Sequence, residues 1–166
     1  MNLKFQYVQS SVHEIKDQYR EMFRSSEALL NRDHGYYCMS ETSKKIWLTA
    51  DFISMCNSRR ENYRFLSEHL KSITWVEPVF NFLPQEIIPI YFPVYVKCDR
   101  TMLQNHLASK DIYVPVHWPI PESCSHSLTQ NAENIYRNIL SIPCDQRYDL
   151  HDMARIFNEI KEFETN

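Results

Sequence analysis

The chain has 166 residues, a formal net charge of −3 and a single glycine, Gly35. Loops that cradle phosphate need several residues with positive φ or without a side chain. One glycine therefore excludes a P-loop, a G-x-G-x-x-G dinucleotide turn and a G-x-S-x-G nucleophile elbow. The small net charge and the lack of a polybasic run argue against nucleic acid or an anionic membrane as a partner.

The composition is typical of a globular, cytoplasmic protein. Hydrophobic residues make up 43% of the chain, which is enough for one sizeable core. Proline or charge interrupts every apolar stretch before it reaches transmembrane length, and residues 1–10 lack the apolar core of a signal peptide. The five cysteines are scattered and form no C-x-x-C pair, so we expect free thiols in a reducing compartment.

The first half of the sequence predicts two long helices. Residues 11–31 carry an apolar stripe at helical spacing, with Ser10 or Ser11 as the N-cap and Glu14 completing a capping box with Ser11. Residues 32–42 hold Gly35 and read as a connector. Residues 43–72 repeat the helical pattern over a longer span, with a break near residues 57–58 as an open alternative.

The second half predicts strands that alternate with helices. Residues 87–98 suit a strand pair, or one strand after an irregular edge, because four prolines divide the β-branched and aromatic stretch 78–93. The remaining elements are expected as a helix at 99–109, a strand at 112–118, a helix at 127–140, a strand at 140–144 and a helix at 149–163 capped by Asp149. We therefore predict an α+β (α/β-like) fold with a small, roughly three-stranded sheet covered by helices. Its expected parts are residues 1–42, an N-terminal helix and connector, and residues 43–166, one α/β domain, within one compact unit.

The residues with metal-binding or nucleophilic side chains give no strong catalytic pattern. His117, Cys124 and His126 fall within one short segment, but it contains two prolines and no helical i, i+4 spacing, so an exposed loop is favoured over a zinc site. Cys124 lies near Glu122 rather than near a cation, which argues against a reactive thiolate. We expect no metal site and no catalytic residue in this chain.

Two basic pairs also suit structural roles. Lys44 and Lys45 follow small hydroxyl residues, as a Schiff-base lysine can, but no phosphate cup or acid partner is recognisable nearby. Solvated lysines at a helix N-terminus are favoured. Arg59 and Arg60 lie on a charged helix that either faces solvent or forms an interface.

Four segments in this order resemble the C-terminal part of fold type I aminotransferases, which use pyridoxal phosphate, and most closely the DegT-type sugar aminotransferases. They are RRENY at 59–63, FPVYV at 92–96, HWP at 117–119 and LSIPCDQRY at 140–148. In that family an R-R-x-N-Y helix leads from the large domain into the small C-terminal domain. The L-S-x-P-x-D-x-R-Y segment precedes that domain's last helix.

The resemblance implies which residues face a substrate and which domain is missing. The loop after the second strand of the small domain approaches the substrate, which points to His117 as a hydrogen-bonding group and Trp118 as an apolar wall. A core position for Trp118 and a polar strand end for His117 stay open. Arg59 and Arg60 become candidates for interdomain or anion contacts. The family's cofactor lysine, pyridine-binding aspartate and phosphate loop belong to the large domain, so we expect this chain to bind no cofactor and not to transaminate alone.

Two functions remain open from the sequence. The chain is either the small domain of an aminotransferase-like enzyme, which a separate large-domain chain completes with pyridoxal phosphate, or a non-catalytic interaction or dimerisation module that retains the fold. The long amphipathic helices favour a homo-oligomer in the second case.

Overall fold

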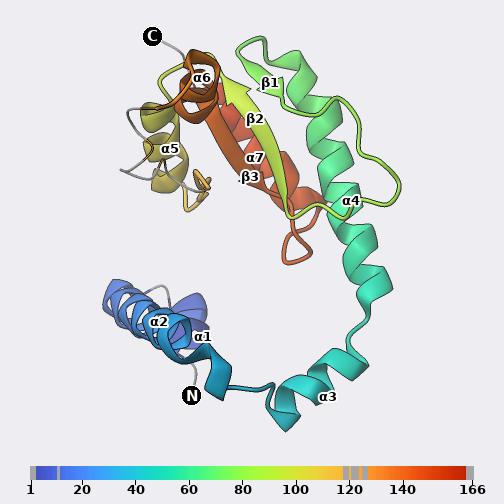
Figure 1. Ribbon diagram of the computed structural model, residues 1–166. Coiled ribbons are helices and arrows are strands. Elements are labelled where there is room, and N and C mark those ends of the chain that lie inside the picture. Colours follow the sequence, from blue (N-terminus) through green and yellow to red (C-terminus); the bar gives the residue numbers. More distant parts are fainter. Residues whose placement is uncertain (1–2, 11, 118–119, 121–123, 125–126, 164–166) are drawn as a thin grey trace. The chain divides into compact units, whose positions relative to one another are not determined.

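The computed structural model describes residues 3–10, 12–117, 120, 124 and 127–163 (Figure 1). The chain divides into two compact units, residues 1–50 and 51–166, which we call unit 1 and unit 2. The domain boundary predicted at residues 42–43 lies within a helix of unit 1. None of the helices in the described ranges has the length and apolarity that crossing a membrane requires.

Unit 1 consists of helices with largely exposed side chains. Its elements are α1 (Leu3–Ser10), α2 (His13–Asp33), a 3-10 turn (His34–Tyr36) and α3 (Glu41–Thr49). The helix predicted at 11–31 is confirmed as α2, but α1 was not predicted. Val12, not a serine, occupies the N-cap of α2 and no side chain caps it; Ser11 lies outside the described residues. Ser10 instead ends α1, where its hydroxyl donates to the Gln6 carbonyl.

Gly35 lies in the 3-10 turn, within the predicted connector. Its φ is not positive, and a Cβ placed there would meet nothing within 4 Å. The turn therefore does not require glycine.

The long helix predicted at 43–72 is two helices, and the proposed break at residues 57–58 is wrong. The chain leaves α3 at Ala50, whose ψ of 134° is extended, and re-enters a helix as α4 (Phe52–His69). Asp51 causes the interruption because its side chain caps α4 by accepting from the Ser54 amide at 2.9 Å. Residues 57–58 lie inside α4.

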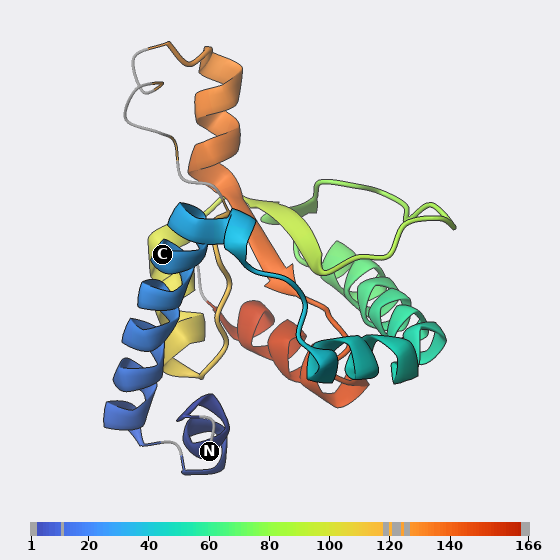
Figure 2. The same cartoon turned by 60° about the horizontal axis from the view of Figure 1, so that its bottom comes forward.

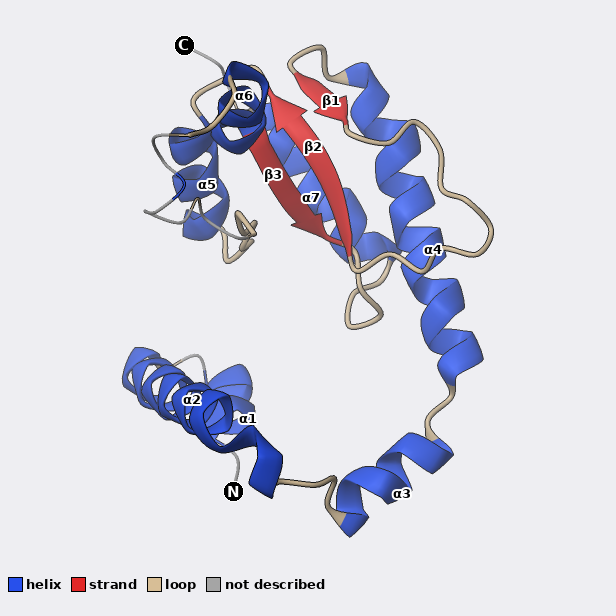
Figure 3. Ribbon diagram, in the orientation of Figure 1, coloured by secondary structure: helices blue, strands red, loops and turns tan. Residues whose placement is uncertain are grey.

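Unit 2 contains a three-stranded antiparallel sheet with strand order β1-β2-β3. After α4 come a 3-10 turn (Leu70–Ser72), β1 (Val76–Pro78), β2 (Tyr91–Val96), α5 (Arg100–Ser109), α6 (Gln130–Asn138), β3 (Ile139–Pro143) and α7 (Leu150–Glu162). α4 packs against α7 and also contacts β2, and the two helices lie side by side beneath the sheet (Figures 2 and 3). The predicted α+β class and three-stranded sheet are confirmed.

The core of unit 2 lies between the sheet and these helices. Phe92 pairs with Ile142 and Val94 with Leu140 across β2 and β3, and all four side chains are almost fully buried. Leu66 of α4 and Met153 of α7 are fully buried in the same cluster. Buried side chains alternate along β2, as expected for a strand with one face on a core.

Pro93 is accommodated in the central strand because β1 is short. β1 pairs only with residues 94–96 of β2, so no ladder bond is needed from Pro93 on that side. The Pro93 carbonyl still accepts from the Val79 amide at 3.0 Å. The first half of β2 is therefore an open edge toward the long connection 79–90.

The strand predicted at 112–118 is not a strand in its described part, 112–117. Ile112 and Val114 are buried, which explains the alternating pattern. Of the backbone hydrogen bonds among the described residues, one joins this stretch to the sheet, from the Ser141 amide to the Pro115 carbonyl at 3.2 Å, and Pro115 has no N–H to return one. The alternation of apolar residues therefore reflects burial of Ile112 and Val114 and not pairing with a neighbouring strand. Trp118 lies outside the described residues.

Candidate functional site

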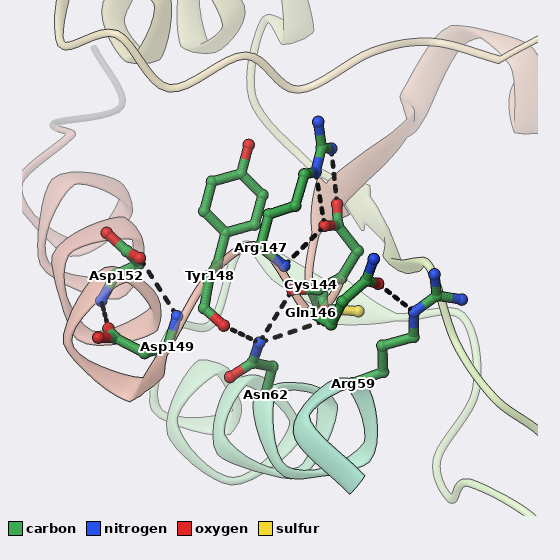
Figure 4. A network of polar contacts seen from close by, with 9 residues as sticks. Arg59, Asn62, Cys144, Gln146, Arg147, Tyr148, Asp149 and Asp152 are labelled. Carbon is green, nitrogen blue, oxygen red and sulfur yellow. Dashed lines mark hydrogen bonds and ion pairs between the residues drawn. The ribbon is translucent and has the colours of Figure 1, made fainter. Parts of the chain in front are cut away.

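The buried amide of Asn62 connects α4 to the turn between β3 and α7. Its Nδ2 donates to the carbonyl oxygens of Cys144, Asp145 and Tyr148 at 3.4, 3.2 and 2.8 Å (Figure 4). Asn62 is 2% exposed, so these bonds are made away from water. Backbone carbonyls in such a place need a donor, and Asn62 supplies it from a different element.

Arg59 and Arg60 reach two different parts of unit 2. Arg59 Nε donates to Gln146 Oε1 at 2.6 Å, next to the Asn62 bonds (Figure 4). Arg60 Nη1 donates to the carbonyl oxygens of Pro84, Gln85 and Ile87, at 2.9, 2.9 and 2.6 Å. Both arginines thus hold loops against α4. Their predicted interdomain or anion contacts stay predictions.

Asp145 and Arg147 form the charged part of this network. Arg147 Nε and Nη2 bind the two carboxylate oxygens of Asp145 at 2.7 and 2.8 Å, in the bidentate geometry of strong ion pairs. Burial alone would raise the pKa of Asp145, but the hydrogen bonds and charge of Arg147, with a contribution from Arg59, lower it below its usual value. The Asp145 hydrogen bond in turn raises the pKa of Arg147. Asp145 is therefore a permanent carboxylate near neutral pH.

Cys144 is buried in the same turn and is chemically quiet. Burial, and then the neighbouring Asp145 carboxylate, raise the pKa of its thiol to about 12 against a small opposing effect of Arg59. Its side chain is fully buried. A thiol that keeps its proton and cannot be reached is not a nucleophile, so Cys144 has a packing role.

His117 lies beside the start of β2. Its ring packs edge-on against Tyr91, with centroids 4.4 Å apart, and the residue is exposed. Tyr91 pairs with Pro143, the last residue of β3, so His117 lies at the end of the sheet from which the 144–148 turn leaves. The structure thus brings His117 to the same sheet end as that turn, whereas Trp118 lies outside the described residues.

Asn62, Gln146 and Tyr91 were not chosen as site residues from the sequence. Asn62 and Gln146 lie inside RRENY and LSIPCDQRY, two of the segments that carry the resemblance. Membership of these segments is the sequence feature that could have identified them as site residues. Tyr91 carried none, because its contact with His117 joins residues far apart in the chain. The motifs meet in space, and their polar residues bind mainly one another and the backbone.

Among the described residues, one group has side chains placed closely enough to hold a metal ion: Asp149, His151 and Asp152, within 4.8 Å of one another. Both carboxylates already serve the helix start. Asp149 Oδ1 accepts from the amides of His151 and Asp152, and Asp152 Oδ2 accepts from the Asp149 amide. This capping box accounts for the cluster. Of the predicted loop trio His117, Cys124 and His126, the last lies outside the described residues.

The described lysines that most resemble a cofactor lysine do not fit pyridoxal phosphate. Lys44 and Lys45 are exposed on α3, and Lys44 Nζ binds Glu41 Oε1 at 2.7 Å. A lysine that forms a Schiff base needs a site that lowers its pKa by removing it from water. An exposed lysine paired with a carboxylate has the opposite surroundings, so no catalytic step is assigned to these residues.

Comparison with known proteins gives a match in fold alone. No protein-family model matches the chain, and no curated protein sequence does. Solved structures match, among them a sugar aminotransferase from Micromonospora echinospora (18% identity, TM-score 0.60, 69% of this chain and 32% of that one). PseC from Helicobacter pylori, an aminotransferase of pseudoaminic acid biosynthesis, matches at 15% identity with a TM-score of 0.58, over 64% of this chain and 32% of that one. A DegT-type aminotransferase from Brucella abortus matches at 19% identity with a TM-score of 0.55, over 68% of this chain and 32% of that one.

The chain spans about a third of the length of these enzymes. The identities are too low to carry over a substrate or a mechanism, but the three-dimensional match holds over most of the chain. The resemblance drawn from the four sequence segments is confirmed at this level: the chain has the fold of part of a DegT-type sugar aminotransferase.

Proposed function

We propose that this chain acts as the small domain of a sugar aminotransferase, together with a large domain that binds pyridoxal phosphate. The observation that carries the proposal is the meeting of the RRENY and LSIPCDQRY segments around Asn62, within a fold shared with sugar aminotransferases. A small domain that closes on a cleft must move as one rigid body. The Asn62 and Arg59 bonds tie α4 to the turn between β3 and α7 and support such rigidity.

His117 is our candidate for the residue that faces the substrate. It is exposed at the sheet end, and Tyr91 fixes its ring from the side. An imidazole there offers a donor and an acceptor to a sugar hydroxyl. Trp118 follows it directly in sequence and is the candidate for an apolar wall.

The amino-transfer chemistry itself is assigned to the large domain. Pyridoxal phosphate supplies the electron sink for such reactions, and the lysine that holds it would come from that domain. Solved neighbours include one aminotransferase captured in both its PLP and PMP forms, from Streptococcus pneumoniae. In this proposal the present chain orients the sugar and excludes water from the cleft.

The test is co-expression of the full chain with a large-domain polypeptide encoded beside it. We expect the two to copurify and the complex to show the visible absorbance of bound pyridoxal phosphate. Separate elution of the two chains with no such absorbance would overturn the proposal. His117→Ala should retain copurification but weaken sugar binding, whereas His13→Ala, at an exposed position of α2, should change neither.

A second candidate function is self-association through unit 1. Several large apolar side chains of α2 and α3 are exposed, including Phe23 (63%), Trp47 (61%) and Leu48 (81%). Exposed apolar side chains in this density are typical of surfaces that bind a protein. Sedimentation of the purified chain at micromolar concentration should then show a dimer or larger species. A single monomeric species would eliminate this candidate.

A further inference from the structure

The connection between β1 and β2 borders a cavity of about 560 Å³ in unit 2, which is open to solvent on the side of Phe80 and Phe82. It lies between residues 79–89 of that connection, Tyr63 of α4 and the open edge at the start of β2. Figure 1 shows this connection as the long light-green segment beside α4. The volume is within the usual range for sites that bind small molecules.

Hydrogen bonds fix the cavity walls at three places. At one end the Val79 amide donates to the Pro93 carbonyl, and at the other the Cys144 amide donates to the Ile90 carbonyl at 3.2 Å. In the middle, Arg60 binds the carbonyl groups of Pro84, Gln85 and Ile87. A connection held at both ends and at its centre keeps its cavity open without a ligand, which lowers the entropic cost of binding.

The lining is aromatic and uncharged. It contains four aromatic side chains and three prolines: Tyr63, Phe80, Phe82, Tyr91, Pro84, Pro89 and Pro93. Among the described residues that line the cavity there is no lysine, arginine, aspartate or glutamate. A charged ligand would lose hydration there without gaining a counter-ion, whereas a flat apolar ring would pack against the walls.

One polar side chain in the lining is buried and unpaired. Tyr63 is 3% exposed, and burial and the nearby Cys144 are the influences on its hydroxyl, with no hydrogen bond from it among the described residues. The hydroxyl oxygen is not fully enclosed, so a ligand in the cavity can reach it. Burial raises the pKa of Tyr63, so the hydroxyl keeps its proton and can donate a hydrogen bond to an acceptor.

We propose that this cavity binds an uncharged aromatic small molecule whose carbonyl oxygen accepts a hydrogen bond from the Tyr63 hydroxyl. His117 does not line the cavity, although Tyr91 both lines it and packs against the His117 ring. It is carried by the coincidence of a pre-formed aromatic cavity, a lining without charge and one buried hydroxyl that needs an acceptor.

The test uses 2-naphthamide as the probe and 2-naphthoate as its charged counterpart, titrated into the full chain and followed by amide NMR shifts. We expect naphthamide to shift the signals of residues 79–93 and to bind at least about tenfold more tightly than naphthoate. Tyr63→Phe removes only the hydroxyl and should weaken the binding of naphthamide about three- to tenfold. Phe82→Ala, at a wall position 74% exposed, should weaken it further without unfolding the chain.

Phe52→Ala is the matched control, because Phe52 is also an exposed phenylalanine but lies at the start of α4, outside the cavity lining. It should leave the affinity unchanged. Equal affinity for both probes, equal effects of Phe82→Ala and Phe52→Ala, or shifts confined to unit 1 would each overturn the proposal. If the complex of this chain with a copurified large-domain polypeptide did not bind naphthamide, the cavity would belong to a protein interface, and this result would also overturn the proposal.

Discussion

A carboxamide at position 62 donates to three carbonyl groups of one turn, so truncating it leaves those groups without that donor inside the protein. We expect Asn62→Ala to lower the free energy of unfolding by about 1–3 kcal/mol. Urea unfolding measures this. Asn57→Ala makes the same chemical change on the same helix at an exposed position and should alter stability by about 0.5 kcal/mol or less. Equal losses in the two variants would argue against the role given to Asn62.

Asp145 makes stability depend on pH in the acid range. Its pKa in the folded protein lies below the ordinary value of an aspartate, so the unfolded chain binds the proton more readily. The stabilisation is complete at a pH above the pKa that Asp145 has in the unfolded chain, and it is lost as the pH falls through its pKa in the folded protein. Urea midpoints measured from pH 6 downward to about pH 2 should therefore decline less steeply in Asp145→Asn than in the natural chain.

The Asp145→Asn variant should also be less stable near neutral pH, because the paired Arg147 loses its partner. Glu68→Gln removes a negative charge at an exposed position of α4 and serves as the charge-matched control. If Glu68→Gln flattened the acid decline as much as Asp145→Asn, the effect would reflect net charge and not this ion pair.

At the scale of elements, two aspartate caps agree with the sequence, whereas the serine cap expected at the start of the 11–31 helix does not, because Val12 takes that position. Asp149 was predicted to cap the last helix and does so in a full capping box. At the start of the helix predicted at 99–109, the Asp99 carboxylate accepts from the amides of Thr101 and Met102. Such bonds are made within three residues, so the sequence alone specifies them.

Elements that depend on distant partners were harder to predict. The break between α3 and α4 was placed too late because Asp51 was not recognised as a cap. The 112–117 segment has the alternation of a strand, but Pro115 prevents a ladder with β3. β1 has only three residues and exists through its pairing with β2, which no local pattern reveals.

Similarly, the motif residues were visible in sequence, but the bonds from Asn62 to the 144–148 turn join residues more than eighty positions apart.

Removal of the Asp149 side chain should weaken α7 at its start. We expect Asp149→Ala to destabilise unit 2 by about 1 kcal/mol, since two backbone amides lose their acceptor. Asp149→Asn retains a good capping oxygen and should lose only part of this. Thermal unfolding followed by circular dichroism compares the two variants. Identical losses would show that the carboxylate's charge, and not its capping bonds, is what matters.

At the scale of the whole molecule, the buried apolar core belongs to unit 2. The described apolar residues that are buried all lie between Tyr63 and Ile160, and unit 1 contributes none. A core of this kind is what makes a domain fold independently. We therefore expect a fragment of residues 51–166 to unfold in urea in one cooperative transition. A fragment without a transition, or with the spectrum of an unfolded chain, would contradict the division into units.

The central claim, that this chain works as the sugar-orienting domain of an aminotransferase, is tested most directly by amino transfer itself. The measurement is the rate at which the chain, mixed with a large-domain polypeptide encoded beside it and with pyridoxal phosphate, moves an amino group from an amino acid to a keto sugar. The account predicts turnover by the mixture, none by either chain alone, and a loss of about tenfold or more in His117→Ala. Turnover by the large-domain polypeptide alone, unchanged on adding this chain, would contradict it.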